Sequence, residues 1–300
     1  MDPLLDWFQM FLIQVSIICV KSHTYVGQGD SWEGACNTGT KQSPIDVVTA
    51  HTIRTNFIPF IFMNYDQELN LEMKNTKHTI KFEIAPPRDR FIHPYVRGGG
   101  LKHNYQFFQG HFHWGSKINQ GSEHCIDGKF SPMEIHLVHF NTNLGKTPAE
   151  AIAANQYNSL AVLGGKFVIG RKNLGLKPLF EALSNVQNSG KKTKIKEKMK
   201  LSDLAPKNIE SFFRYNGSLT TPGCNEIVVW TLFKEPIEIS QDQLDEIRKT
   251  KNSQMKENSN NYRKVQPLNG RKVLDSRATN IIKIDMIILL ISSFVRSVIV

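Results

Sequence analysis

Two imidazoles lie two residues apart in residues 109–114, whose sequence is QGHFHW. If this segment is a β-strand, His111 and His113 point to the same face, because side chains alternate with a period of two. A second apolar segment, residues 134–140 (EIHLVHF), carries His136. If the two strands are neighbours, the three histidines can bind one metal ion and leave the fourth tetrahedral position of Zn²⁺ open for water, which is the pattern of a catalytic zinc site.

Polar residues precede two of these histidines at the same spacing. Gln109 lies two residues before His111, and Glu134 lies two residues before His136, so each shares a strand face with the histidine that follows it. A carbonyl or carboxylate at such a position can accept the ring N–H that the metal does not use. A single histidine in such a context is more often an ordinary core or surface residue. The repeated spacing makes a metal site the better interpretation.

The elements that would position these residues are mostly short strands. Runs of β-branched and aromatic residues, separated by Gly, Pro and Asn, predict strands at residues 78–84, 104–114, 133–140, 166–170 and 226–233. Helical patterns are sparse, and residues 148–157 and 241–250 are the best candidates. No break in composition divides residues 24–274, so we expect one domain, rich in β-structure, with long connections.

The positive charge of the chain is concentrated in short stretches. The 300 residues carry 37 Lys and Arg against 27 Asp and Glu, a net charge of +10, and six of the lysines lie within residues 191–200. Such a run without interleaved aromatic residues is typical of a solvated loop or helix face, so we expect no nucleic-acid partner. Hydrophobic residues make up 40% of the chain, which argues against wholesale disorder.

Both terminal segments resemble processing signals. Residues 7–20 form an apolar run too short to span a bilayer comfortably, and small residues follow it, so we interpret residues 1–22 as a secretory signal peptide. A buried first helix is the alternative. Residues 286–300 are mostly apolar, with small residues upstream, so we interpret residues 275–300 as a GPI-attachment signal in preference to a permanent span. These signals predict a secreted protein or one held by lipid at the extracellular face of the membrane.

Cysteine usage agrees with secretion. Removal of the signal peptide would take Cys19 and leave Cys36, Cys125 and Cys224 in the mature chain. Three cysteines predict one disulfide and one spare thiol, and the spacing by itself does not choose the pair.

Across nearly all of residues 24–274 the chain resembles the α-class carbonic anhydrases. The matching segments are QSPIDV (42–47), QGHFHWGS (109–116), GSEH (121–124), EIHLVHFN (134–141), LAVLG (160–164), GSLTTPGC (217–224), VVWTLFKEPI (228–237) and NYR..QPLNGR (261–271). The resemblance implies a single catalytic domain, residues 23–274, of mostly β (α+β) class: a large, mainly antiparallel, twisted central β-sheet with a few short surface helices.

The same resemblance implies an activity. It indicates a monomeric zinc enzyme, a carbonate dehydratase, that hydrates CO₂ reversibly to bicarbonate and a proton through a zinc-bound hydroxide held by three histidines. A catalytically inactive cell-surface binding protein of the same fold is the alternative. Inactive relatives typically lose metal ligands, so the complete set in this chain favours the enzyme.

The resemblance also assigns roles to individual side chains. Thr220 matches the threonine that accepts a hydrogen bond from the zinc-bound hydroxide, and Glu123 matches the buried carboxylate that orients this threonine. His78 matches the histidine that carries protons at the cavity mouth, and Lys77 beside it should lower the pKa of that imidazole. The remaining assignments are the zinc ligands His111, His113 and His136, their hydrogen-bond partners Gln109, Glu134 and Asn261, and the substrate pocket of Val138, Val162, Leu219, Thr221 and Trp230.

The cysteine pair and three departures complete the comparison with the family. Cys36 and Cys224 match the paired cysteines of extracellular members, which leaves Cys125 as the spare thiol. Gly110 replaces the usual aromatic residue before the first zinc ligand. Gly223 and Lys264 each replace a frequent proline, and the first of these changes suggests a looser loop.

Overall fold

A computed structural model describes residues 25–86, 93–252 and 254–276. The expected signal peptide, residues 1–22, lies outside the described residues, as does nearly all of the expected C-terminal signal, residues 275–300. Within the described part of the chain, no helix is both long and apolar enough to cross a membrane.

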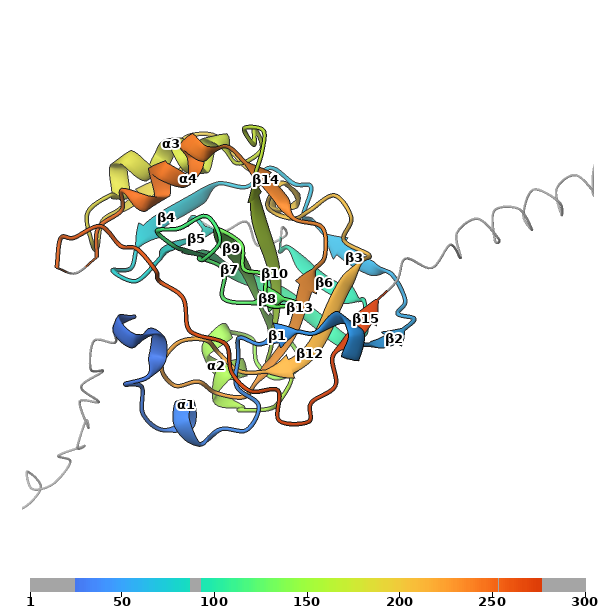
Figure 1. Ribbon diagram of the computed structural model, residues 1–300. Coiled ribbons are helices and arrows are strands. Elements are labelled where there is room, and N and C mark those ends of the chain that lie inside the picture. The colour runs from blue at the N-terminus through green and yellow to red at the C-terminus, as the bar shows by residue number, and fades with distance from the viewer. Residues whose placement is uncertain (1–24, 87–92, 253, 277–300) are drawn as a thin grey trace, which may run out of the picture.

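One large sheet of 13 strands runs through the molecule (Figure 1). Its main path is β11 (Lys192–Lys194), β4 (Leu71–Asn75), β5 (Ile80–Ile84), β7 (Leu101–Trp114), β9 (Met133–Asn141), β10 (Leu160–Ile169), β13 (Val228–Phe233), β12 (Phe212–Gly217), β15 (Leu274–Ser276) and β2 (Ile53–Thr55). Beside this path, β3 (Phe60–Met63) pairs with β6 (Tyr95–Gly98), β6 pairs with β7, and β14 (Ile237–Ile239) pairs with β10. A separate small sheet joins β1 (Asp46–Val47) to β8 (Cys125–Ile126).

Most strand pairs are antiparallel. The pairs β10–β13, β10–β14, β15–β2 and β1–β8 are the parallel ones among the described strands. The predicted class, a large and mainly antiparallel sheet with few helices, is therefore confirmed.

The helices are short and lie outside the sheet. They are α1 (Ala35–Thr38), α2 (Pro148–Ala153), α3 (Lys177–Ala182) and α4 (Gln241–Arg248), with 3₁₀ turns at Val26–Gly29, Thr49–His51, Leu183–Val186 and Leu201–Leu204. The two helices expected from the sequence are α2 and α4, and each begins directly after a residue whose side chain caps it. Thr147 caps α2 ahead of Pro148, and Ser240 forms a capping box with Gln243 at α4.

Several boundaries of the expected elements differ from the structure, and the two largest differences are at α2 and β10. The helix expected at 148–157 ends at Ala153, and Asn155 close behind it has a φ of 49°, which a continuing helix does not allow. The strand expected at 166–170 begins already at Leu160 as β10. Gly164 lies inside this strand, where a Cβ would lie 2.8 Å from Leu232, so the glycine permits close packing without interrupting the strand.

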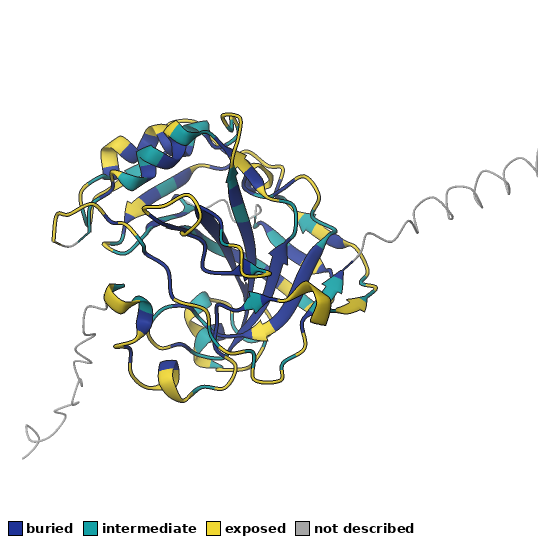
Figure 2. Cartoon of the chain, in the orientation of Figure 1, coloured by how far each residue is buried: buried dark blue, intermediate teal, exposed yellow. Residues whose placement is uncertain are grey.

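Strand β9 lies at the centre, and all nine of its residues are buried (Figure 2). Its two faces enter different cores. Ile135 and Leu137 belong to the larger apolar cluster, which α3 and α4 cover, whereas Val138 and Phe140 belong to a second cluster that includes Ala151 of α2. His136 shares its parity with the second set, so it points to the same side of the sheet as Val138.

Candidate active site

Three histidine rings converge on one face of the central sheet. His111 and His113 project from β7, and His136 projects from β9 directly opposite His111. The ring centroids lie 5.1 Å apart for His111 and His113, 5.1 Å for His111 and His136, and 4.6 Å for His113 and His136. One nitrogen from each ring lies within 4.8 Å of the other two, which is a spacing that one metal ion can bridge.

The second nitrogen of each ring already has an acceptor. His111 Nδ1 lies 3.0 Å from Gln109 Oε1, His113 Nδ1 lies 2.8 Å from the carbonyl of Asn261, and His136 Nε2 lies 2.7 Å from Glu134 Oε1. These contacts leave Nε2 of His111, Nε2 of His113 and Nδ1 of His136 to face the shared centre. The polar partners therefore select which nitrogen each ring can offer.

A buried nitrogen without a partner supports the metal interpretation. His113 Nε2 has no hydrogen-bond partner among the described residues, although buried polar atoms are nearly always satisfied. Burial lowers the pKa of His113 to about 3, and burial together with the two neighbouring rings holds the pKa of His111 well below its usual range. Neutral imidazoles are the form that binds metal, so this donor set fits Zn²⁺.

Glu134 connects the histidine cluster to a hydrogen-bond chain that the sequence interpretation missed. Besides His136, it accepts hydrogen bonds from the Nδ1 and the backbone N–H of His124, at 2.7 and 2.9 Å. His124 Nε2 then lies 2.6 Å from the Tyr215 hydroxyl, which donates to Ser43 Oγ at 2.9 Å. Burial alone would raise the pKa of Glu134, but His124 and His136 outweigh it and hold that pKa well below the ordinary value. Glu134 is therefore a charged acceptor for both rings.

Glu123 lies behind the cluster and is fully buried. Its Oε1 accepts the backbone N–H of Arg263 at 2.8 Å and lies 3.5 Å from His113 Nδ1. Glu123 Oε2 has no hydrogen-bond partner among the described residues, and the nearby Thr220 side chain lowers the pKa of this carboxyl. Burial raises the pKa of Glu123 well above its usual value, and the contacts with Thr220 and Arg263 oppose that rise.

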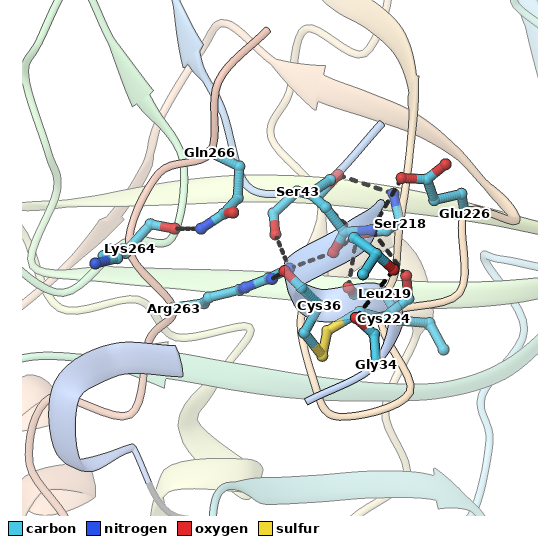
Figure 3. Close-up of a disulfide and its surroundings, with 12 residues drawn as sticks. Gly34, Cys36, Ser43, Ser218, Leu219, Cys224, Glu226, Arg263, Lys264 and Gln266 are labelled. Atoms are coloured by element: carbon cyan, nitrogen blue, oxygen red, sulfur yellow. Dashed lines mark hydrogen bonds between the residues drawn. A yellow bond between two sulfur atoms is a disulfide. The ribbon is translucent and has the colours of Figure 1, made fainter. Parts of the chain in front are cut away.

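The loop that carries Thr220 is fastened at its base. A disulfide joins Cys36 to Cys224, as the resemblance implied (Figure 3). Cys125 is a buried free thiol. Ser43 and Ser218 exchange hydrogen bonds of 2.9 and 3.0 Å between backbone N–H groups and hydroxyls. Figure 3 shows these contacts beside the disulfide. The loop is thereby tied to the N-terminal part of the domain.

Arg263 lies in the same region and was not singled out from the sequence. Its guanidinium donates to the carbonyls of Cys36 and Ser43 and to Gln42 Oε1, at 2.8–2.9 Å (Figure 3). One residue thus supports both the disulfide segment, through its side chain, and Glu123, through its backbone N–H. Arg263 belongs to the family segment that begins at Asn261, but the sequence assigned no role to it.

Gly223 has a φ of 101°, which the ring of a proline forbids. The replacement of a frequent family proline at this position therefore accompanies a different local backbone. Two contacts restrain the loop that was expected to be looser. The backbone N–H of Cys224 donates to the Thr221 carbonyl at 2.9 Å, and Cys224 itself forms the disulfide.

A cavity of about 340 Å³ opens over the inward-facing nitrogens. All five residues of the expected substrate pocket line it, together with Thr220: Val138, Val162, Leu219, Thr221 and Trp230. Phe108, Ile152 and Leu160 extend this apolar wall and were not foreseen. Polar residues line the remainder, namely Thr76, His78, Thr79, Lys81, Gln109 and Tyr25.

His78 lies in a tight turn between β4 and β5. Lys77 before it has a φ of 81° and donates its backbone N–H to Asn75 Oδ1, and the His78 carbonyl accepts the amides of Asn258 and Asn261 at 2.9 Å each. Burial lowers the pKa of His78, and the charge of Lys77 lowers it further. The sequence expectation named the charge of Lys77; burial is the larger cause.

Known proteins resemble the chain over most of its length. A profile of the eukaryotic-type carbonic anhydrases matches residues 28–277. Carbonic anhydrase 4 of Rattus norvegicus is 37% identical over 257 residues, which is 83% of this chain and 80% of the relative. Putative carbonic anhydrase 5 of Caenorhabditis elegans is 38% identical over 248 residues, 81% of this chain and 77% of the relative. Human carbonic anhydrase 7 is 33% identical over 243 residues, 78% of this chain and 88% of the relative.

Proposed function

This chain belongs to the eukaryotic-type carbonic anhydrase family, and from that premise we propose how its own residues act and where the protein works. It is a zinc-dependent carbonate dehydratase that interconverts CO₂ with bicarbonate and a proton. The observation that carries this conclusion is the arrangement of the three imidazoles: each has one nitrogen held by a polar partner and the other directed at the common centre.

His111, His113 and His136 would hold Zn²⁺, which when bound acts as a Lewis acid that activates water near neutral pH, chemistry for which carbonic anhydrases are the standard example. The chain's contribution is to fix the donors before the metal arrives. Because Gln109, Asn261 and Glu134 each engage the outer nitrogen, the rings need little rearrangement to bind.

Thr220 orients the reacting oxygen. Its hydroxyl has one proton, and donation of this proton to Glu123 leaves the Thr220 oxygen able only to accept. A threonine in that state discriminates between orientations of a neighbouring O–H group. The role requires an ionised Glu123, and a dication among the nearby histidines favours that form in spite of burial.

The apolar wall receives CO₂. Val138, Val162 and Trp230 are buried and belong to the second apolar cluster, so they are held by the core behind them. Leu219 packs against the same cluster from the loop that also carries Thr220. A small uncharged substrate is favoured by an apolar surface, and Thr221 lies where this surface meets the polar residues of the cavity.

His78 accepts the proton that each hydration releases and passes it to buffer. It lines the cavity and is only half-buried, so it can exchange with solvent. An imidazole suits this task because its usual pKa lies near 6.5.

The activity test is a stopped-flow CO₂-hydration assay on purified protein. Metal-free protein should be inactive and should regain activity with one equivalent of zinc. His136→Ala should remain folded and inactive. Full hydration activity in metal-free protein would contradict the assignment.

The cellular location is a second part of the proposal. A disulfide between Cys36 and Cys224 favours an oxidising compartment. We take residues 1–22 as a signal peptide, residues 23–274 as the catalytic domain, which acts as a monomer, and residues 275–300 as a lipid-attachment signal. A phosphatidylinositol-specific phospholipase should then release the activity from intact cells. Mass spectrometry that detects residues 286–300 in the mature protein would contradict the anchor.

A further inference from the structure

Three lysines form a row that leads to the first histidine of the cluster. In the sheet register, Lys192 of β11 lies opposite Lys74 of β4, Lys74 lies opposite Lys81 of β5, and Lys81 lies opposite His111 of β7. Directly opposed residues share one face of a sheet, and neighbouring strands lie about 4.8 Å apart. The row therefore runs along one face from the sheet edge to the cavity.

Lys81 is the charged end of this row inside the cavity. Among the described residues that line the cavity, it is the only one with a formal charge when the histidines are neutral. Lys74 and Lys192 are exposed, so their charges face solvent at the approach.

Acidic neighbours cancel only part of this charge. Lys81 Nζ lies 3.5 Å from Glu83 Oε2, and Lys192 Nζ lies 3.4 Å from Glu72 Oε1. Both ion pairs are partly open to solvent and contribute little. Lys74 adds a third positive charge, and Lys77 lies in the adjacent turn, so the approach remains positive overall.

The substrate and product of the reaction differ in charge. CO₂ is neutral, whereas bicarbonate carries one negative charge. A positive charge in a cavity with a low-dielectric wall concentrates small anions near it, and salt weakens the effect. Such a field attracts bicarbonate but not CO₂, and it leaves the binding of CO₂ in the apolar pocket unchanged.

We propose that Lys81, continued by Lys74 and Lys192, is an anion path that guides bicarbonate and other small monovalent anions between solvent and the histidine cluster. The inference rests on the proposed function, because it assigns the charged reactant of that same site to one wall of the cavity. Lys81 acts through its charge and not through contact with the reacting atoms.

Thiocyanate binding to the zinc-loaded protein, followed by isothermal titration calorimetry, tests this path. Lys81→Gln should weaken binding about three- to fivefold at low ionic strength, and the difference should shrink at about 200 mM salt. Glu83→Gln should strengthen binding, because it removes a negative charge beside Lys81. Lys102→Gln is the matched control: it removes the same charge from the far end of β7, about 30 Å along the strand from His111.

The proposal would be overturned if wild type, Lys81→Gln and Glu83→Gln bound thiocyanate with equal affinity at low salt. It would also be overturned if the loss of thiocyanate affinity in Lys81→Gln were the same at low and high salt. If Lys81→Gln fails to fold, two other variants take its place: the double variant Lys74→Gln/Lys192→Gln, and Glu83→Gln. Thiocyanate affinity equal to that of wild type in both of these variants would overturn the proposal. Zinc content and CO₂ hydration of the wild type are measured on the same samples. A wild type that binds no zinc or does not hydrate CO₂ would refute the proposed function. An active, zinc-loaded wild type whose variants do not show the expected affinity changes would refute only the anion path.

Discussion

The aromatic ring of Phe82 occupies the space beside the Cα of Gly110. The two residues are directly opposite on β5 and β7, and a Cβ at position 110 would lie 2.1 Å from Phe82 Cζ. The family that this chain resembles usually has an aromatic residue at position 110, so the ring that fills this part of the core comes from the neighbouring strand. His111, one of the three histidines of the candidate zinc site, follows Gly110 directly.

The packing of Phe82 on Gly110 predicts non-additive mutations. Gly110→Phe should destabilise the protein by about 1–3 kcal/mol through overpacking, and Phe82→Ala by about 3–5 kcal/mol through a cavity. The double variant should lose less unfolding free energy than the two single variants together, because the new ring at position 110 fills the cavity left by Phe82. Urea unfolding measures the three free energies, and strict additivity would show that the rings do not compete for one space.

Zinc affinity should depend on the outer hydrogen bonds of the rings. Gln109→Ala removes the acceptor at 3.0 Å from His111 Nδ1 and should weaken zinc binding about 10–100-fold. Competition with a chromophoric chelator measures the affinity. Gln106→Ala is the control, since Gln106 lies on the same strand and contacts His93 instead. An unchanged zinc affinity in Gln109→Ala would show that this amide does not orient the ring.

Turnover in dilute buffer should depend on His78. His78→Ala should lower kcat by roughly tenfold or more, and added imidazole should restore much of it. The kcat/KM for CO₂ should stay the same, because proton export follows the chemical step. Unchanged kcat in dilute buffer would remove His78 from the proton route.

The charge of Lys77 should tune that route. Because Lys77 adds to the lowering of the His78 pKa by burial, Lys77→Gln should move this pKa upward, toward its ordinary value. NMR titration of the imidazole protons measures the shift. A shift in the opposite direction would contradict the placement of the two side chains.

The disulfide should contribute substantially to stability. It joins residues 188 positions apart, and its loss in Cys36→Ser or Cys224→Ser should cost about 2–5 kcal/mol of unfolding free energy. Cys125→Ser changes a buried thiol without removing a bridge and serves as the control. If reductant destabilises wild type and Cys36→Ser equally, the bridge is not the cause.

Buried His139 should make the protein sensitive to acid. Burial lowers its pKa to about 4, and its Nε2 pairs with the Tyr65 hydroxyl. The unfolded state binds a proton near pH 6.5, so this contribution to stability is complete above that pH and declines as the pH falls toward 4. The loss amounts to about 3 kcal/mol. Urea unfolding measures the free energy of unfolding between pH 7 and 4, and this free energy should fall less steeply with pH in His139→Gln than in wild type. An equal fall in the two proteins would show that His139 does not cause the acid sensitivity.

Local patterns were sufficient to identify the chemistry of the site. The period-two spacing of His111 and His113, the match of Glu134 to His136, and the family segments predicted a three-histidine zinc centre on a large antiparallel sheet. The two-residue spacings depend only on neighbouring residues in a strand, so they can be read without knowing which strands pair. That the two histidine strands lie side by side in a large sheet was implied by the family resemblance.

Only the tertiary structure revealed the partners that come from distant parts of the chain. The guanidinium of Arg263 reaches the carbonyl of Cys36 across 227 residues, and the hydrogen bond between His124 and Tyr215 spans 91 residues. Asn261, by contrast, was already implied by the family resemblance. The lysine row and the Phe82–Gly110 contact depend on strand register, in which a shift of one residue moves every side chain to the opposite face. Register is a property of paired strands and not of either sequence segment, which is why Lys81 could be recognised as part of the cavity only after β5 was placed beside β7.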